Sequence, residues 1–383
     1  MDGSKAPDWD RIHSGFPVNR HLIWLNNCGT TPLGDPMRGS VNAWLDAYQR
    51  RGSAAEGFSY LGTKASIHRR LERLLHARQG ELALVHHTSE GMNFISHGLA
   101  LDPGDEILLL ENEYPSNVYP WEHWREKGVH LRFVPVTGSP ADFLAAFAAA
   151  AGPRTKVASL SAVFWCNGMP FPLEAIGKLC AERGITFVVD GSQGVGLIDL
   201  DVKACGIHYM AFSAWKWLLG PLGLGVLYVS RDHLETLNPI FKGTESVPGD
   251  GEYLPYKHGW KPSADRFAIS TGSMTDWVYF DASLAFLEEI GFDRVRERIR
   301  ALAHRLSEGL RGAGYRLASD GFPGLETGIV AASRPGLDAA AAVKALKERN
   351  IVVAERLGRI RLAPHVYNSE RQIDQVVAEM AGL

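Results

Sequence analysis

The sequence predicts an α/β fold, in which a mostly parallel seven-stranded sheet carries helices on both faces and a smaller α+β domain follows. Short apolar or β-branched runs alternate with helical segments through the middle of the chain, and this alternation is typical of a doubly covered sheet. The predicted strands of the large sheet are 83–86, 106–110, 131–136, 157–162, 186–189, 209–213 and 225–229.

Helices are predicted where apolar residues recur every three or four positions, as they do at Ile67, Leu71 and Leu75. The predicted helices are 37–51, 63–77, 89–99, 121–127, 140–151, 172–183, 281–310 with a break near Gly291, 338–349 and 370–381. Two further strands are expected at 326–332 and 351–354, and the polar stretch up to about residue 20 is expected to be extended.

The chain has 383 residues, of which 45% are hydrophobic, and this length exceeds the usual size of one compact domain. The change in pattern near residue 280 predicts a large domain over 21–280 and a small domain over 281–383. Residues 1–20 are expected to join the small domain.

Composition excludes several classes of partner. The net charge is −3 and no Lys/Arg run occurs, which argues against a nucleic-acid surface or an anionic membrane face. Apolar runs such as 145–151 are too short to span a bilayer, and the N-terminus lacks the apolar region of a secretory signal. The four cysteines are scattered, without zinc spacing, so no metal site is predicted, and a cytoplasmic protein with reduced thiols is expected.

Two segments combine residues of chemical interest. The first, VDGSQG at 189–194, places Asp190 at the carboxyl end of an apolar strand, where open α/β sheets bind ligands. The second, FSAWKWLLGPLGLG at 212–225, follows another strand and places Lys216 between two tryptophans, ahead of a glycine-rich turn. Alone, such an aspartate usually caps a turn and such a lysine usually snorkels from an apolar patch.

The order of these residues resembles the VDGAQ…SxHKxxGPxGxG pattern of the class V aminotransferases, which are fold-type I pyridoxal phosphate (PLP) enzymes. The family includes cysteine desulfurases, selenocysteine lyases and isopenicillin N epimerase. The resemblance runs from Trp24 to Asn368. It implies that Lys216 carries the cofactor as a Schiff base and then moves the proton at the substrate Cα.

The resemblance also implies the other cofactor contacts. Asp190 would pair with the pyridinium nitrogen, Gln193 would bond the ring 3-oxygen, and Ser213 would bind the phosphate. The segment 86–93 opens a helix after a strand, which is either a phosphate site or a simple N-cap. The family places its phosphate loop there, so Thr88 and Ser89 are assigned to the phosphate.

Further family segments imply contacts from elsewhere in the chain. Tyr114 stands where the family has a histidine stacked on the cofactor ring, although a core tyrosine is the simpler alternative. Thr271, in RFAISTG at 266–272, matches a threonine that reaches the phosphate of the neighbouring subunit, which implies a homodimer with shared active sites. Arg361 matches the arginine that grips the substrate carboxylate, and Asn26 falls near the substrate entrance.

The chain departs from the desulfurase pattern at two places. Trp215 replaces the family's histidine before the lysine. The segment 351–360 contains no cysteine, which excludes a persulfide mechanism at that position. For Cys28 and Cys166, a packed thiol is favoured over a catalytic one.

These observations predict a PLP enzyme that acts on an amino acid through a carbanion at Cα. A lyase that eliminates a β-substituent is favoured, while an aminotransferase and an epimerase stay open. A catalytically inactive PLP-binding protein is the non-enzyme alternative, against which the Lys216, Asp190 and Arg361 set argues. A cofactor-independent sugar or nucleotide protein on a Rossmann-like sheet is a further alternative, and it is weakened because no GxGxxG follows the first strand.

Overall fold

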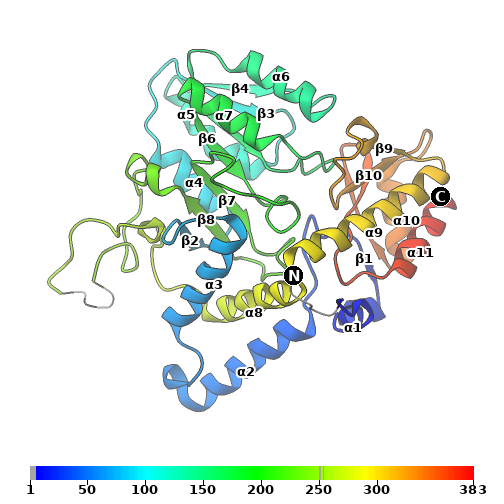
Figure 1. Ribbon diagram of the computed structural model, residues 1–383, viewed down its shortest axis with the longest axis horizontal. Helices are drawn as coiled ribbons and strands as arrows, with labels where there is room; N and C mark the ends of the chain where they lie inside the picture. The colour runs from blue at the N-terminus through cyan, green and yellow to red at the C-terminus, as the bar shows by residue number, and fades with distance from the viewer. Residues whose placement is uncertain (1–5, 250–251, 253) are drawn as a thin grey trace.

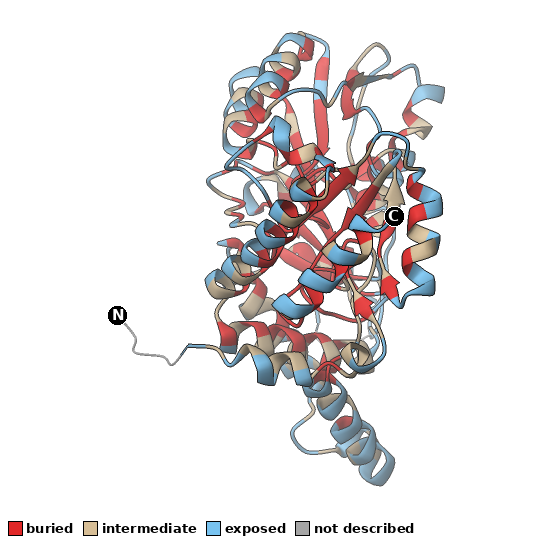
Figure 2. Ribbon diagram, turned by 90° about the vertical axis from the view of Figure 1, so that its right-hand side faces the viewer, coloured by how far each residue is buried: buried red, intermediate tan, exposed pale blue. Residues whose placement is uncertain are grey.

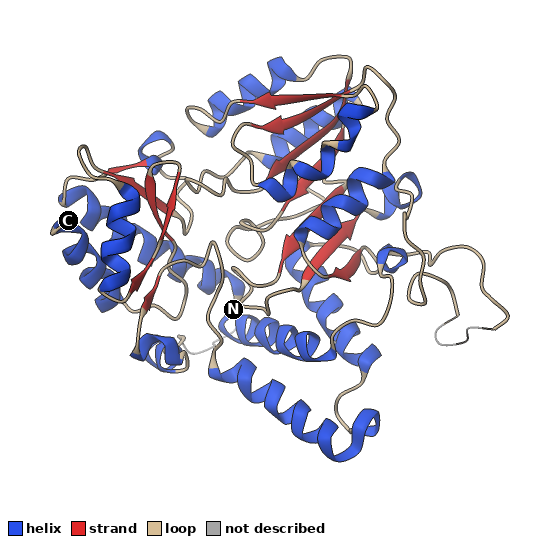
Figure 3. Cartoon of the chain, turned by 180° about the vertical axis from the view of Figure 1, so that it is seen from behind, coloured by secondary structure: helices blue, strands red, loops and turns tan. Residues whose placement is uncertain are grey.

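The computed structural model describes residues 6–249, 252 and 254–383, so the first five residues of the predicted N-terminal segment lie outside the described part. Figure 1 shows two bodies of secondary structure, one around a large sheet and one around a small sheet near the C-terminus. Figure 3 shows the same two sheets from behind, each with helices packed beside it.

The large sheet has seven strands in the order β2-β8-β7-β6-β5-β3-β4. Their bounds are β2 (Leu82–Val85), β3 (Glu106–Leu110), β4 (His130–Val134), β5 (Thr155–Ser161), β6 (Thr186–Asp190), β7 (Tyr209–Ser213) and β8 (Gly225–Val229). Strand β8 runs antiparallel to both of its neighbours, β2 and β7, and the remaining described pairs of this sheet are parallel. The predicted seven-stranded, mostly parallel sheet is therefore confirmed.

Both faces of this sheet are buried, as the red strands of Figure 2 show. Leu108 and Leu110 of β3 belong to one apolar cluster, while Ile107 and Leu109 belong to another on the opposite face. Successive side chains of β3 therefore point to opposite faces of the sheet. No polar residue follows Glu106 in this strand, as expected for a strand that is covered on both sides.

Helices cover the two faces. The helices of the chain are α1 (Trp9–Ser14), α2 (Asp35–Arg51), α3 (Tyr60–Leu75), α4 (Thr88–Gly98), α5 (His123–Glu126), α6 (Pro140–Ala150), α7 (Leu173–Arg183), α8 (Met274–Ile290), α9 (Phe292–Gly312), α10 (Ala339–Glu348) and α11 (Glu370–Ala381). Side chains of α3, α6, α7 and α8 share one cluster, and those of α4 and α5 share the other. Among the described residues, none of these helices has the length and apolar character needed to cross a bilayer.

The small domain has an antiparallel sheet in the order β12-β13-β10-β9. Its strands are β9 (Arg316–Leu317), β10 (Val330–Ser333), β12 (Ala354–Arg356) and β13 (Arg359–Leu362). A separate parallel pair joins β1 (Ile23–Trp24) to β11 (Ile351–Val352), and Ile23 and Leu25 share the apolar cluster of this domain. The boundaries at 20 and 280 stay predictions, and the N-terminal chain contributes to the small domain through β1.

The prediction of an extended N-terminal stretch is wrong for the described residues, which form α1 and a 3-10 turn at Pro17–Arg20. Asp8 caps α1 by accepting a hydrogen bond from Arg11 N. Phe16 then stacks on Tyr367, with ring centroids 4.4 Å apart. This contact spans most of the chain, so no local pattern could have revealed it.

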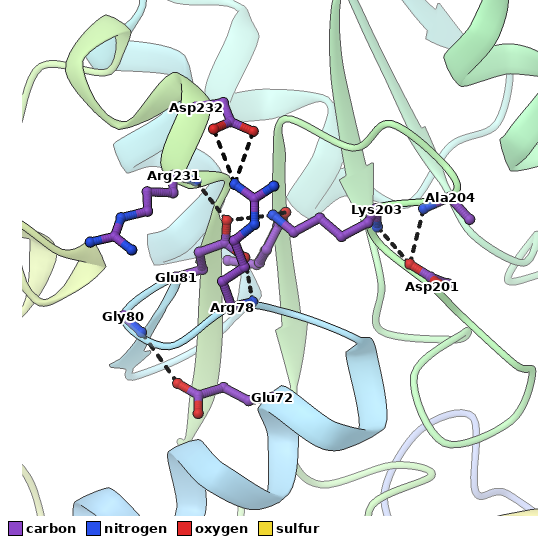
Figure 4. Close-up of polar contacts among 10 residues, drawn as sticks. Glu72, Arg78, Gly80, Glu81, Asp201, Lys203, Ala204, Arg231 and Asp232 are labelled. Atoms are coloured by element: carbon purple, nitrogen blue, oxygen red, sulfur yellow. Dashed lines mark hydrogen bonds and ion pairs between the residues drawn. The ribbon is translucent and has the colours of Figure 1, made fainter.

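A buried ion network lies at the amino-terminal end of β2 (Figure 4). The fully buried Glu81 side chain accepts hydrogen bonds from the backbone nitrogens of Arg78 and Arg231, each at 2.7 Å, and pairs with Lys203. Lys203 Nζ also lies 3.1 Å from Tyr228 Oη. The buried Glu81 carboxylate and the Lys203 amine are therefore both partnered within the chain.

Candidate active site

The predicted site residues follow the carboxyl ends of adjacent strands. Asp190 ends β6, Ser213 ends β7, and Lys216 comes three residues after β7. Helix α4 begins directly after β2, with His87 as its N-cap. Open α/β sheets bind their ligands at this edge, because side chains from neighbouring strands converge there.

A cavity of about 290 Å³ opens at this edge, close to the lower end of the usual range for ligand sites, about 300–1,000 Å³. Its lining residues are Cys28, Gly29, His87, Thr88, Ser89, Tyr114, Ser116, Trp165, Ser192, Gln193, Trp215, Lys216, Arg356 and Arg361. Three of the lining residues, Lys216, Arg356 and Arg361, have permanently or commonly cationic side chains, and no Asp or Glu lines the cavity. The cavity is therefore suited to anionic groups.

Lys216 and Asp190 are both buried, with exposed fractions of 8% and 3%. Burial lowers the pKa of Lys216, while the nearby Asp190 acts in the opposite direction. Burial likewise raises the pKa of Asp190, against the effect of Lys216. A lowered pKa makes the neutral amine more accessible, and the neutral amine is the form that attacks a carbonyl.

Tyr114 lies beside the lysine. The Lys216 Nζ atom is 5.4 Å from the centroid of the Tyr114 ring, and among the described residues no hydrogen bond or ion pair to Nζ is present. Tyr114 also packs edge-on against Trp165, with centroids 5.3 Å apart, and remains 40% exposed. Its ring is thus at the cavity wall rather than in the core.

The phosphate assignments meet around the start of α4. Thr88 Oγ1 lies 2.8 Å from Ser192 Oγ, and Ser89 Oγ lies 2.8 Å from Ser116 Oγ. Ser213 Oγ is buried and has no hydrogen-bond partner. A buried hydroxyl normally finds a partner, so this orphan atom fits the phosphate of PLP, whose oxygens accept hydrogen bonds.

Gln193 is held firmly at the cavity wall. Its Nε2 donates to the Cys28 carbonyl at 2.9 Å, and its Oε1 accepts from Trp217 Nε1 at 2.9 Å. One amide hydrogen is left over, because a primary amide carries two. That hydrogen fits the assignment to the ring 3-oxygen.

Arg361 reaches the cavity from β13 of the small domain and is only 2% exposed. Its Nη1 donates to the Trp165 carbonyl at 2.7 Å, and its Nη2 lies 3.4 Å from Asn26 Oδ1. The Nε atom is buried without a partner. Asn26 therefore orients the guanidinium, and the unused donor fits a carboxylate ligand.

Thr271 is not brought together with the other site residues in the described chain. It is exposed and lines a different pocket, with Tyr60, Trp277 and His86. His86 lines this pocket and the next residue, His87, lines the cavity, so the two pockets are close together near the start of α4. Within one chain, Thr271 is thus a neighbour of the site rather than part of it.

Sequence reasoning did not assign several residues that line or support the cavity, namely Glu113, Ser116, Trp165, Ser192 and Arg356. Glu113 accepts hydrogen bonds from Ser161 Oγ and from the backbone nitrogens of Ser161 and Tyr114. Burial, the largest influence, raises its pKa to about 7. Its place beside Tyr114 in the matched motif was the signal that could have identified it.

The cysteines keep the character expected of packed thiols. Cys28 and Cys166 are buried, and burial raises the pKa of both, that of Cys166 to about 12. Strands β12 and β13 are joined by a short turn at Leu357 and Gly358. That turn leaves no cysteine-bearing loop ahead of Arg361.

The comparisons with known proteins agree with this geometry. The family described as aminotransferase class-V matches residues 27–375. A probable cysteine desulfurase of Pyrococcus abyssi is 28% identical, covering 95% of this chain and 94% of its own. The isopenicillin N epimerase of Amycolatopsis lactamdurans is 32% identical, covering 82% and 83%.

The solved structures of one protein, C-DES, are also similar. Its complex with cysteine persulfide, described as the cystine C–S lyase with its reaction product, has a TM-score of 0.88 and 25% identity, covering 96% of this chain and 99% of that chain. A variant with glycine covalently linked to the PLP cofactor has a TM-score of 0.89 and 25% identity, covering 98% and 99%.

Fold and site together define a fold-type I enzyme dependent on pyridoxal phosphate. The chain belongs to the class-V aminotransferase family. The predicted family, fold class and cofactor are thereby confirmed, together with an enzyme that acts on an amino acid.

Proposed function

We propose that this enzyme is a C–S lyase, which eliminates a sulfur substituent from the β-carbon of an amino acid. The observation that carries the proposal is the buried Lys216 amine beside Asp190, in a cavity whose other wall carries Arg361. The similarity to C-DES, a cystine C–S lyase, favours elimination over the other reactions of the family. The β12–β13 turn, which has no cysteine, argues against a persulfide formed on the enzyme.

When bound, PLP draws electrons away from the substrate Cα and so makes its proton removable. Arg361 holds the α-carboxylate through its free guanidinium donor, and the Asn26 contact fixes its direction. Lys216 would hold the cofactor, and its buried amine would accept the Cα proton of the substrate. Asp190 would hold the proton of the ring nitrogen.

The overall reaction breaks the Cα–H and Cβ–S bonds. The sulfur leaves with the bonding electron pair and gains a proton, which gives a thiol. The remaining three-carbon unit takes up one water molecule and yields pyruvate and ammonium. No oxidant or reductant is needed.

An epimerase is the second candidate, favoured by the identity of 32% to an isopenicillin N epimerase. Epimerisation needs proton carriers on both faces of Cα. Lys216 supplies one, and Tyr114, beside the Lys216 amine, is the candidate for the other. Cys166 is a poor candidate, because burial raises the pKa of its thiol to about 12.

The reaction is tested by incubating the holoenzyme with S-substituted cysteines in deuterated water. Release of a thiol with pyruvate and ammonia supports the proposal. Deuterium at Cα without release indicates an epimerase, and a keto acid with the amine form of the cofactor indicates an aminotransferase, so either result contradicts elimination. The Lys216→Ala variant is expected to lose at least about a hundredfold in rate.

A homodimer with shared active sites is also part of the proposal. Thr271 is exposed on the wall of a pocket that Tyr60 and Gly223 also line, and their sequence neighbours Leu61 and Leu222 are 66% and 65% exposed. Exposed apolar side chains of this size favour a protein contact. Thr271 of one subunit would then complete the phosphate site of its partner.

Mixing two inactive variants tests the shared site. Lys216→Ala and Thr271→Glu subunits, unfolded and refolded together, are expected to recover about a quarter of wild-type activity, because half of the dimers carry one intact site. Activity no higher than that of the separate variants would contradict the shared site.

We also propose a cytoplasmic location. The four cysteines are free and buried, as in proteins of reducing compartments. Cell fractionation with a compartment marker tests it, and recovery outside the cytoplasmic fraction would contradict it.

A further inference from the structure

The cavity contains a second guanidinium that the reaction proposed above does not use. Arg356 lines the cavity with Arg361, and the two guanidinium carbons lie 5.7 and 5.9 Å from the centroid of the same Trp165 ring. The α-carboxylate of an amino acid needs only one of them.

The β-hairpin places both side chains on one face of the small sheet. Arg361 is directly opposite Ala354 in the β12–β13 pairing, and Arg356 follows Ala354 by two residues. Residues two apart on a strand share a face, so Arg356 and Arg361 are diagonal neighbours, with a separation of about 7–8 Å between such positions. This spacing suits two anionic groups at opposite ends of one small molecule.

Arg356 lacks an acidic partner among the described residues. Its Nη1 donates to the Glu355 carbonyl, while the Glu355 carboxylate accepts a hydrogen bond from Gly358 N at 2.7 Å. Arg356 is half-buried, and no Asp or Glu lines the cavity. Since arginine binds planar carboxylates through paired hydrogen bonds, a ligand carboxylate is the natural complement.

We propose that Arg356 is a specificity-determining residue that binds a second carboxylate, carried on the substrate side chain beyond the β-sulfur. The inference rests on the proposed lyase function and refines its substrate class. Arg361 takes the α-carboxylate, and Arg356 takes the distal one. The preferred substrate is then an amino acid with acidic groups at both ends.

The test compares two probes of similar size, S-carboxymethylcysteine, which carries a second carboxylate, and its uncharged amide, S-carbamoylmethylcysteine. For the wild-type holoenzyme, kcat/KM is expected to favour the acid by about tenfold or more, the size of a charge-assisted hydrogen bond. Arg356→Gln is expected to bring the ratio close to one, and Arg356→Lys to retain part of it.

Arg359→Gln is the matched control. Arg359 lies on the same hairpin, but its Nη1 lies 3.2 Å from Ser333 Oγ and it does not line the cavity. This variant is expected to keep the wild-type ratio. A wild-type ratio of one or less, or an unchanged ratio in Arg356→Gln, would overturn the inference.

A binding measurement separates this inference from the lyase proposal. The affinities of the holoenzyme for glutamate and glutamine, measured by titration calorimetry, compare acid with amide without any elimination. If neither cysteine probe releases thiol, the lyase proposal fails. A glutamate preference that disappears in Arg356→Gln still supports the second carboxylate site, and its absence in the wild type overturns it.

Discussion

Two regions of the large sheet, one before β2 and one after β7, differ in how their buried polar groups are partnered. Around Glu81, which precedes β2, the buried carboxylate is paired with Lys203 and accepts backbone hydrogen bonds inside the chain (Figure 4). Around Lys216, which follows β7, the amine has no hydrogen bond among the described residues, and Ser213 Oγ and Arg361 Nε lack partners. The first arrangement stabilises the fold, while we propose that the groups of the second bind the cofactor and the substrate.

The largest effect is expected from breaking the partnered region. Glu81→Ala leaves Lys203 without its ion pair and two backbone N–H groups without an acceptor. We expect the free energy of unfolding to fall by about 3–5 kcal/mol, as for other buried ion pairs broken on one side. Urea denaturation measures this loss.

Asp232→Ala is the control, since Asp232 and Arg78 form an ion pair in the same network while both are exposed. An exposed pair contributes at most about 1 kcal/mol. Equal losses in the two variants would contradict the role given to burial.

The next effect is a pH dependence that comes from Glu113. Its pKa is raised from the usual 4.5 to about 7, so the folded protein keeps a proton that the unfolded chain releases. The stabilisation is complete below about pH 4.5 and is lost as the pH rises to about 7.

The side chain of the Glu113→Gln variant cannot ionise, so this dependence of stability on pH should disappear. Between pH 4 and 8, the difference in unfolding free energy between variant and wild type is expected to change by about 3 kcal/mol in favour of the variant. Urea denaturation at a series of pH values measures it. If the free energies of unfolding of the two proteins change with pH in parallel, Glu113 keeps its ordinary pKa.

A third comparison separates catalysis from stability. Asp190→Asn is expected to lower kcat by about a hundredfold or more, because the amide cannot hold the ring nitrogen protonated. The melting temperature of the apoprotein should not fall. In the wild-type chain, Ser192 N donates to Asp190 Oδ1 at 2.9 Å, and the amide oxygen of the variant can accept the same hydrogen bond. The amide is also uncharged, so its burial carries no cost of desolvating a charge.

Asp201→Asn is its counterpart. Asp201 Oδ1 accepts hydrogen bonds from Lys203 N and Ala204 N and so caps a turn. This variant should lose some stability while kcat stays the same. An unchanged kcat in Asp190→Asn would mean that Asp190, too, only caps a turn.

The smallest effect concerns Ser213. Ser213→Ala removes a hydroxyl without a partner, so stability should change by less than about 0.5 kcal/mol, while affinity for PLP should fall about tenfold. Thermal melting and cofactor titration measure the two quantities.

Ser246→Ala provides the contrast, because the buried Ser246 hydroxyl donates to the Ala268 carbonyl at 2.8 Å. Its loss should cost about 1 kcal/mol and leave PLP affinity unchanged. Comparable destabilisation in both variants would argue against a role of Ser213 in binding the phosphate.

The sequence predicted the large sheet better than the small one, for a physical reason. Strands β3, β7 and β8 have the predicted bounds because their apolar runs are buried on both faces. Strand β13, with the sequence RIRL, was not predicted, because its two arginines interrupt the apolar pattern. Arg361 lines the cavity, and Arg359 contacts Ser333 of the neighbouring strand.

The site residues, too, differ in how well the sequence could predict them. Lys216 and Asp190 could be identified because each lies in a local motif at the end of an apolar strand. Arg356 could not, because its importance depends on the pairing of β12 with β13 and on the position of Trp165. Contacts between segments far apart in the chain leave no local pattern.

The most direct test of the central claim is to find the lysine that carries the cofactor. The purified holoenzyme is reduced with borohydride, which fixes an imine to its lysine, and the peptides are analysed by mass spectrometry. The account predicts a pyridoxyl phosphate adduct on Lys216, absent from Lys216→Ala. An adduct on another lysine, or none on protein saturated with PLP, would contradict it.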